Sequence, residues 1–275
     1  MNYLRLLFPV VLGLSCHVEA GWFPDSPLQK TYLALAEHQP NLAWQELQIA
    51  LGEQQLDPQY WHAAKQAILT QTRCGKALRA EQVHVASGVS VSFIRRSGVA
   101  SQGYQIKLTA DSVPSSVPVE LVAPSGEALL VGQLTASAEY QEIETNEMLT
   151  PPPFGLYQLK LGTNRYPMVI SVDDSQPWLS VNVQTHTLSL SLPETVAGCA
   201  DPVANWLWLD EQYAMVKLST VITSTQTSLP GTGQTPMTAR HLSAVATQFE
   251  YQHGVKVEYV QRIAIPLPQK PKLHQ

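Results

Sequence analysis

The chain has 275 residues, with 17 Lys and Arg against 22 Asp and Glu, and a net charge of −5. This acidic balance argues against a nucleic-acid partner, because nucleic-acid-binding proteins carry clustered Lys and Arg. Charged residues make up 14% of the chain, below the roughly one quarter of an average soluble protein, and this composition is common in exported β-rich proteins.

Residues 1–20 have the pattern of a removable export signal. Arg5 provides a basic start, an apolar run follows over residues 6–14, and Ala20 ends a small-x-small cleavage site. The apolar run is less than half of the roughly 20 residues that a membrane-spanning helix needs. We therefore expect a signal peptide, no transmembrane segment, and a periplasmic or secreted protein.

A lipid-anchored form is the competing interpretation of the same segment. Cys16 follows Leu14 and Ser15, and a lipid-modified cysteine needs small residues just before it and an aliphatic residue three positions upstream. Because Gly13 holds that upstream position, we favour cleavage after Ala20 over lipidation at Cys16.

Residues 21–80 are predicted to form a small bundle of three short helices. Ser26 and Asp57 each precede a proline, so that a side-chain oxygen lies at the N-cap and the proline at the first helical position. Asn41 can cap the helix between them. Apolar residues recur at helical spacing within these limits: Leu28, Tyr32, Leu35, Ala36, Ala43, Leu47, Ala50, Leu51, Trp61, Ala64 and Ile68.

Two cysteines remain after the signal, Cys74 at the end of the predicted bundle and Cys199 far along the chain. An even pair in an oxidising compartment most simply forms one disulfide. Isolated thiols or a metal pair are the alternatives, but neither cysteine lies in a Cys-x-x-Cys motif or has a His within a few residues. We therefore predict a Cys74–Cys199 disulfide. By closing so long a loop, it stabilises the folded protein by about 4–5 kcal/mol in the chain-entropy account.

From about residue 81 the apolar spacing changes to every second residue, which indicates strands. Residues 119–123 and 129–133 flank a Pro-Ser-Gly-Glu turn and are expected to form a hairpin. Residues 81–173 are therefore predicted to be one mainly antiparallel β-sandwich. The alternating residues are Val83, Val85, Val89, Val91, Phe93, Tyr104, Ile106 and Leu108.

Residues 155–161 carry a more specific signal, a glycine two positions before Tyr157 at the start of a strand. This resembles the tyrosine corner of immunoglobulin-like sandwiches, in which the phenol hydrogen-bonds back to the preceding corner. Leu159 stands where antibody domains have a cysteine, so the resemblance is to the wider immunoglobulin-like and fibronectin-like class. It implies a structural role for Tyr157 and a closing strand over residues 166–172.

Residues 174–268 are predicted to form a second mainly antiparallel β domain. The clearest element is a hairpin around His253-Gly254, a two-residue turn of the type that requires positive φ. The predicted fold class is α+β, a helical bundle followed by two immunoglobulin-like β-sandwiches. Strands are expected over residues 178–183, 188–192, 204–209, 213–221, 247–252 and 255–265, a linker over 173–177, a mobile Thr- and Ser-rich loop over 223–239, and a disordered tail over 269–275.

The sequence lacks the familiar catalytic and cofactor motifs. It has no His-Glu-x-x-His, Gly-x-Ser-x-Gly, Walker or dinucleotide motif, and its histidines are scattered singly. We therefore expect no metal and no cofactor, and favour a non-enzymatic role.

Two acidic segments could in principle bind an ion. The run Glu139, Glu142, Glu144 and Glu147 has no Asp and no EF-hand spacing, so a solvated strand edge is preferred to a calcium site. Asp173 and Asp174 precede a proline linker, and we expect them only to solvate it.

Trp206 and Trp208 form the most distinctive pair in the sequence. Strand alternation places them on one face, with Leu207 and Leu209 on the other. An outward pair would be a platform for a sugar ring or a protein partner. The favoured alternative is that both tryptophans pack against the helical bundle or the first sandwich.

The layout resembles a family of uncharacterised exported proteins of Gram-negative bacteria, defined only as a domain of unknown function. The resemblance depends on Pro-Leu-Gln-x-x-Tyr at residues 27–32, Trp-Gln-Glu-Leu at residues 44–47, and Cys-Gly at residues 74–75. Such proteins look like neighbours of envelope-stress two-component sensors. The resemblance implies an accessory or sensory role in the periplasm and transfers no functional residue.

The leading functional hypothesis is a non-enzymatic periplasmic binding or interaction protein, with an envelope protein or a glycan as its partner. One alternative is a cell-envelope hydrolase or glycan-processing enzyme, which requires a pocket with two convergent titratable groups of shifted pKa. Another alternative is a structural subunit whose exposed strand pairs with a second chain.

Overall fold

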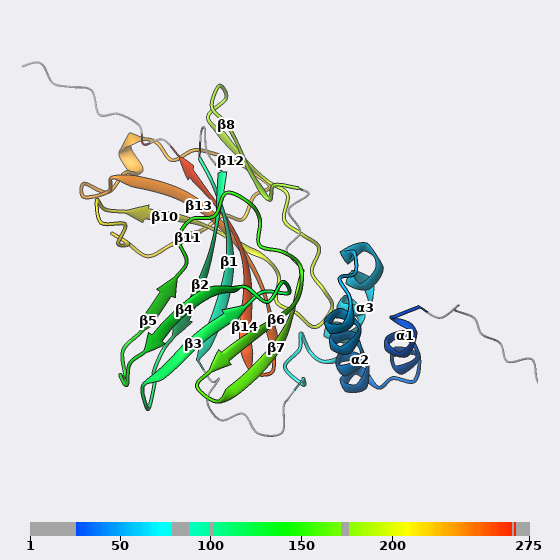
Figure 1. Cartoon of the computed structure of the whole chain (residues 1–275). Helices are drawn as coiled ribbons and strands as arrows, with labels where there is room; N and C mark the ends of the chain where they lie inside the picture. Colours follow the sequence, from blue (N-terminus) through cyan, green and yellow to red (C-terminus); the bar gives the residue numbers. More distant parts are fainter. Residues whose placement is uncertain (1–25, 79–87, 99–101, 172–175, 266, 268–275) are drawn as a thin grey trace, which may run out of the picture.

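A computed structural model describes residues 26–78, 88–98, 102–171, 176–265 and 267 (Figure 1). The predicted signal peptide, Cys16, the residues Val83 and Val85, the Asp173-Asp174 pair and the tail lie outside the described residues. The described chain is mostly β with three helices, as the predicted α+β class requires.

The helical part consists of α1 (Gln29–Ala36), α2 (Pro40–Glu53) and α3 (Pro58–Gln71). Their apolar stripes meet in a core with Val169 of the β part, and the helices lie beside the four-stranded sheet (Figure 1). Among the described residues, no helix combines the length and the apolar composition that a membrane crossing requires. The largest side chains of this core are Trp44, Leu47, Trp61 and Ile68.

Of the three predicted helix caps, only Asp57 is at its predicted position. Ser26 Oγ accepts the Leu28 N–H at 3.3 Å, but α1 begins at Gln29 with Leu28 as its N-cap, so Pro27 is not the first helical residue. The Asp57 carboxylate accepts the backbone N–H of Gln59 at 2.9 Å, as an N-cap before a proline should. Asn41 does not cap α2, because Pro40 already occupies the first helical position and leaves Asn41 inside the first turn.

Three sheets make up the β part (Figure 1). All strand pairs are antiparallel except β1 with β14. The seven-stranded sheet has the order β11 (Thr220–Val221), β10 (Val203–Leu209), β13 (His241–Gln252), β14 (Val255–Ile265), β1 (Val89–Ser97), β2 (Gln102–Ala110) and β5 (Gln141–Glu144). The four-stranded sheet has the order β4 (Ala128–Leu134), β3 (Val117–Val122), β6 (Gly155–Leu161) and β7 (Asn164–Ile170), and the three-stranded sheet the order β12 (Gln226–Ser228), β9 (Thr187–Leu190) and β8 (Leu179–Asn182).

The two predicted β regions share one sheet, so the prediction of two consecutive, separate sandwiches is wrong in this respect. Strand β1 from the first region pairs in parallel with β14 from the second, over residues 90–97 and 256–263. Two apolar cores still form, one from residues 89–170 with Val255 and Val257, the other within residues 178–265. The long β13–β14 hairpin contributes to both cores, with Val255 and Val257 in the first and Leu242 and Ile265 in the second.

The hairpin turn is present as predicted, and the segment before β13 is more ordered than predicted. His253 has φ 51° and Gly254 has φ 85°, the positive values that a tight two-residue turn requires. Residues 223–239 are not only a loop, because β12 within them pairs with β9, and a short 3₁₀ helix follows at Thr232–Gln234. Conversely, only Thr220–Val221 of the strand predicted over residues 213–221 forms one.

Tyr157 occupies the position that its motif predicts. Its side chain is buried, and its hydroxyl donates to the carbonyl of Pro153 at 2.5 Å. Its ring also meets Phe93 of β1 edge-on, with 5.5 Å between ring centroids. The tyrosine therefore joins the four-stranded sheet, its preceding corner and the seven-stranded sheet.

Candidate functional site

A buried ion pair lies where α3 meets the long hairpin. Lys65 projects from the apolar face of α3, and its Nζ is 2.7 Å from Oε1 of Glu250 on β13. The two side chains are 2% and 8% exposed. Two charges so far from water require hydrogen-bond partners beyond each other.

Those partners are present. Lys65 Nζ also donates to Ser171 Oγ at 3.1 Å and to the hydroxyl of Tyr259 at 3.0 Å, so its three protons have three acceptors. Glu250 Oε1 accepts from the Tyr259 hydroxyl at 3.1 Å and from Gln252 Nε2 at 2.6 Å. Every member of this network has a partner, which makes it a rigid joint between the helices and the sheet.

Burial shifts the pKa values of two of these groups. It lowers the pKa of Lys65, and the nearby Glu250 carboxylate opposes that shift without reversing it. Burial and, next, the charge of Glu250 raise the pKa of Tyr259 well above its ordinary value. The lysine is therefore easier to neutralise than an exposed one, whereas the phenol keeps its proton.

Gln252 extends the joint to the edge of the four-stranded sheet. Its fully buried side-chain amide accepts the backbone N–H of Val169 at 2.8 Å and donates to the Val169 carbonyl at 2.9 Å. It thus pairs with the edge strand β7 as another strand would. Glu250 and Gln252, near the end of β13, therefore contact α3 and β7 respectively.

A cavity of about 200 Å³ lies over this network, and we call it the junction cavity. Its wall is mainly apolar and comes from the helical part, both faces of the hairpin and the segment that carries Cys199. Lys65, Glu250 and Tyr259 line it as well. The apolar part of the wall includes Leu69, Phe93, Ile94, Pro152, Val196 and Phe249.

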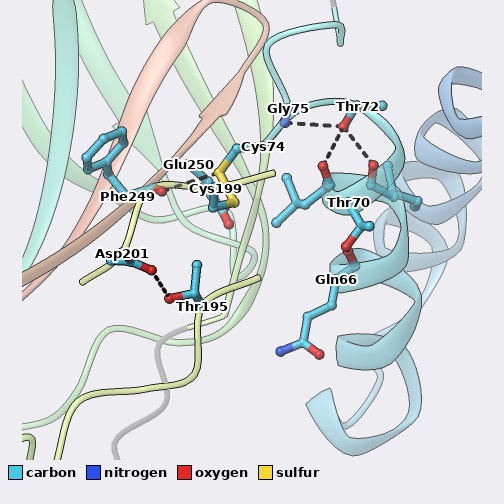
Figure 2. The surroundings of a disulfide bond; sticks show 12 residues. Gln66, Thr70, Thr72, Cys74, Gly75, Thr195, Cys199, Asp201, Phe249 and Glu250 are labelled. Carbon is cyan, nitrogen blue, oxygen red and sulfur yellow. Dashed lines mark hydrogen bonds between the residues drawn. A yellow bond between two sulfur atoms is a disulfide. The ribbon is translucent and has the colours of Figure 1, made fainter. Parts of the chain in front are cut away.

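The predicted disulfide closes one side of this cavity (Figure 2). Cys74 and Cys199 are joined by an S–S bond of 2.01 Å, with 4.7 Å between their Cα atoms. Figure 2 shows the bond linking the end of the helical part to the segment in which Thr195 donates to Asp201 at 2.6 Å. The bond thus fastens a cavity-lining segment to the bundle.

Gly75 explains how closely the bundle approaches the hairpin. It has φ 80°, and a Cβ atom there would lie 1.7 Å from the carbonyl oxygen of Tyr251. Tyr251 in turn donates its backbone N–H to the Cys74 carbonyl at 2.9 Å. Any larger residue at this position would push the hairpin away from the disulfide.

Trp206 and Trp208 are buried, as the favoured interpretation expected, so the outward platform that was the alternative is wrong. Their exposures are 8% and 2%, and they pack in the second β core. The packing partner is therefore that core, and not the helical bundle or the first sandwich. Alanines at positions 204, 244 and 246 leave room in this core, which two large indoles fill.

Two of the four glutamates of the acidic run lie on an edge strand, and Glu139 and Glu147 lie outside it. Glu142 and Glu144 belong to the edge strand β5 and both approach Lys107 Nζ, at 3.2 and 3.4 Å. Within the described ranges, no cluster of three His, Cys, Asp or Glu side chains could hold a metal ion.

Sequence reasoning did not single out Lys65, Glu250 or Tyr259. One signal was available, because Lys65 directly follows Ala64 and lies within the buried stripe between Trp61 and Ile68. A lysine on the apolar face of a helix requires a buried acceptor. The sequence does not say which carboxylate, since Glu250 is far away in the chain.

A second titratable contact docks the hairpin tip on α2. Trp44 Nε1 donates to His253 Nε2 at 3.4 Å, and the Gln48 amide nitrogen lies 3.1 Å from the same atom. The other ring nitrogen, Nδ1, is buried without a hydrogen-bond partner. Burial lowers the pKa of His253, because a charged imidazole would lose its hydration here.

We expect this histidine to make stability depend on pH. Since its pKa is lower in the folded chain than the unfolded value of about 6.5, the unfolded chain binds the extra proton first. The contribution of His253 to stability should be constant well above pH 6.5 and fall as pH drops below it towards the folded pKa. Urea unfolding at pH 7.5 and pH 5 measures how much free energy of unfolding is lost on acidification, which we call the acid loss. The acid loss should be smaller for His253→Asn than for the wild type, because Asn tolerates positive φ but does not titrate.

His186→Asn is the matched control for this measurement. His186 also has positive φ, 51°, but its side chain is exposed. Its replacement should leave the acid loss at the wild-type value. Equal acid losses in the two variants would contradict the assignment to His253.

Comparison with known proteins assigns the chain to a family but does not indicate its function. No curated protein matches its sequence. A solved structure titled "Biofilm associated protein - BSP domain" is 10% identical, over 67% of this chain and 30% of that one, with a TM-score of 0.21. The periplasmic chaperone SfaE is 10% identical, over 63% of this chain and 100% of that one, with a TM-score of 0.19. The family described as "Protein of unknown function (DUF2861)" matches residues 22–268, and the chain therefore belongs to the DUF2861 family.

Proposed function

We propose that the protein is a non-enzymatic binding protein of the periplasm, and that its junction cavity receives an apolar anchor side chain of an envelope protein. The observation that carries this proposal is the cavity itself, with its mainly apolar wall and internally paired polar floor. Small-molecule sites usually measure roughly 300–1,000 Å³. A cavity of about 200 Å³ suits one large side chain of a partner, which is how interface anchors bind.

The compartment and the class of β-sandwich belong to the same proposal. The disulfide supports an oxidising compartment, reached through a cleaved signal over residues 1–20. The Tyr157–Pro153 hydrogen bond supports an immunoglobulin-like assignment for the first β core. The family resemblance suggests an accessory role in envelope sensing. In that case the anchor side chain would belong to a protein of the sensing system.

Site-specific photocrosslinking in intact envelopes tests the proposal. A photoreactive amino acid at Gln66, an exposed position of α3 that lines the cavity, should give one defined cross-linked band. The same probe at Gln59, an exposed position of α3 outside the cavity lining, is the matched control and should give none.

Filling the cavity provides the decisive comparison. Val196→Trp places an indole in the space proposed for the anchor and should reduce the Gln66 cross-link at least tenfold, with an unchanged melting temperature. A cross-link that is absent at Gln66, equally strong at Gln59, or insensitive to Val196→Trp would reject the proposal.

A cell-envelope hydrolase is the second candidate, because Lys65 and Glu250 converge in the cavity and burial lowers the pKa of Lys65. Against this, the lysine has all three protons engaged. Soluble fragments released from purified peptidoglycan by the protein, and absent with folded Lys65→Met, would favour the enzyme.

A further inference from the structure

Strand β4 forms one edge of the four-stranded sheet, and its outer side pairs with no other described strand (Figure 1). An edge strand presents a row of free backbone N–H and C=O groups that can pair with a strand of another chain. Natural sheets usually protect such edges by charge, proline, short length or a covering side chain. The protection that β4 has, compared with the other edges, therefore decides what it can bind.

The other described sheet edges each carry at least one of these protections. The edge strand β5 carries Glu142 and Glu144, and β11, β12 and β8 have only two to four residues. The edge strand β7 has seven residues, but it contains Pro167, and Gln252 occupies both backbone groups of Val169. These edges are therefore poor templates for pairing with another chain.

Strand β4 lacks all of these protections. Its seven residues, Ala128–Leu134, include no charged residue and no proline. The side chain of Val131, in the middle of the strand, is 70% exposed. A long, uncharged edge with an exposed aliphatic side chain is the type that pairs with another chain.

The pairing of β4 with β3 shows which backbone groups of β4 face outwards. The Pro118 carbonyl accepts the Gly162 N–H at 2.9 Å, so the backbone of Pro118 is directed towards β6 and away from β4. Its register partner in β4 is Gln133, which therefore directs its own N–H and C=O away from β3. The alternation of an antiparallel ladder gives Val131 the same direction.

The protein blocks this edge just beyond the strand but leaves it open within the strand. The side chain of Gln141 accepts the Thr135 N–H at 2.9 Å and donates to the Thr135 carbonyl at 2.8 Å. Gln252 blocks β7 in the same way. Within the described residues, no such bond reaches the outward groups of Val131 and Gln133. These two residues therefore leave two donors and two acceptors open.

We propose that β4 pairs antiparallel with β4 of a second copy of this chain, about a two-fold axis at Gly132. In this register Val131 of each copy lies opposite Gln133 of the other, and each pair exchanges two N–H···O=C bonds. Every outward donor and acceptor of the two residues is then used. Gly132 meets its counterpart at the axis, where the two backbones approach most closely and a missing side chain prevents a clash.

The charges around the strand favour a second copy over another kind of partner. A two-fold axis places each residue near its own counterpart, so a charged residue beside the axis would repel itself. No charged residue lies on β4, and on the neighbouring β3 Glu120 is already paired with Lys160 at 2.9 Å. A charged partner strand would thus find no ion pair there. Because no residue of β4 lines the junction cavity, this pairing is independent of the proposed function.

Sedimentation velocity of the purified full-length protein tests the association. A reversible monomer–dimer equilibrium should appear between about 1 µM and about 1 mM protein, the affinity range expected for a small, transient interface. A protein that stays monomeric throughout this range would overturn the proposal.

Val131→Lys tests whether β4 is the interface. It places like charges beside the axis and should weaken the dimer at least about tenfold, and the fold should persist because the side chain is exposed. Val183→Lys is the matched control, because Val183 is also an exposed valine, at 56%, but lies outside β4. It adds the same charge and should change the dimer affinity less than about twofold. An equal effect of both substitutions would place the interface elsewhere and overturn the proposal.

Amide hydrogen exchange, resolved by residue with NMR, tests the register without any substitution. The amides of Val131 and Gln133 should exchange at least about tenfold more slowly where the dimer predominates than where the monomer does, because both N–H groups become bonded. The amides of Gly132 and Leu134, which face β3 in each copy, are internal controls and should change less. A dimer that leaves Val131 and Gln133 unprotected would contradict the β4 pairing.

Discussion

Replacing Lys65 with Met should lower the free energy of unfolding by about 3–5 kcal/mol. The methionine fills most of the space, but it leaves the Glu250 carboxylate buried without its cation, and such unpaired buried charges account for losses of this size. Ser171 and Tyr259 would lose a donor at the same time. Urea unfolding at pH 7 measures the loss.

Two further variants make this result specific. Adding Glu250→Gln to Lys65→Met should recover a large part of the loss, because the buried charge disappears while the amide can still bond to Gln252 and Tyr259. Lys160→Met removes a partly exposed ion pair with Glu120 of nearly the same length, 2.9 Å, and should cost less than about 1 kcal/mol. Similar losses for Lys65→Met and Lys160→Met would contradict the importance of burial.

Replacing both Cys74 and Cys199 with Ala should lower the free energy of unfolding by about 4 kcal/mol. The bond spans a sequence separation of 125 residues, and closing so long a loop strongly restricts the unfolded chain. The same comparison in dithiothreitol should lower the stability of the wild type to that of the variant and leave the variant unchanged. A variant as stable as the oxidised wild type would show that the bond adds nothing beyond the native contacts.

Local sequence signals located much of this fold. Asp57 before a proline marked the start of α3, His253-Gly254 marked the hairpin turn, and the glycine before Tyr157 marked a buried tyrosine with its corner hydrogen bond. The cysteine count identified the disulfide. Each of these signals depends on neighbouring residues or on the chemistry of one residue type.

The remainder depended on contacts between distant residues. The parallel pairing of β1 with β14 joins residues far apart in sequence, and no local pattern encodes it. Alternation put Trp206 and Trp208 on one face but could not say that this face was the inner one. Polar β12 became a strand because β9 offered it a partner, which shows how context can override weak propensity.

The candidate site was the hardest part to foresee. Lys65, Glu250 and Tyr259 come from three elements, and only the docking of α3 on the hairpin brings them together. The tryptophans were identified as distinctive, yet only the packing of the second β core shows that they are buried. The junction cavity therefore arises from tertiary packing more than from any one motif.

The parallel β1–β14 pair has a consequence for the order in which the protein can mature. Strand β1 begins at Val89, whereas its partner β14 begins only at Val255. The central sheet cannot be completed until β14 has been made, and such distant pairings form slowly. Residues of β14 belong to both β cores, so loss of this strand would leave both of them open.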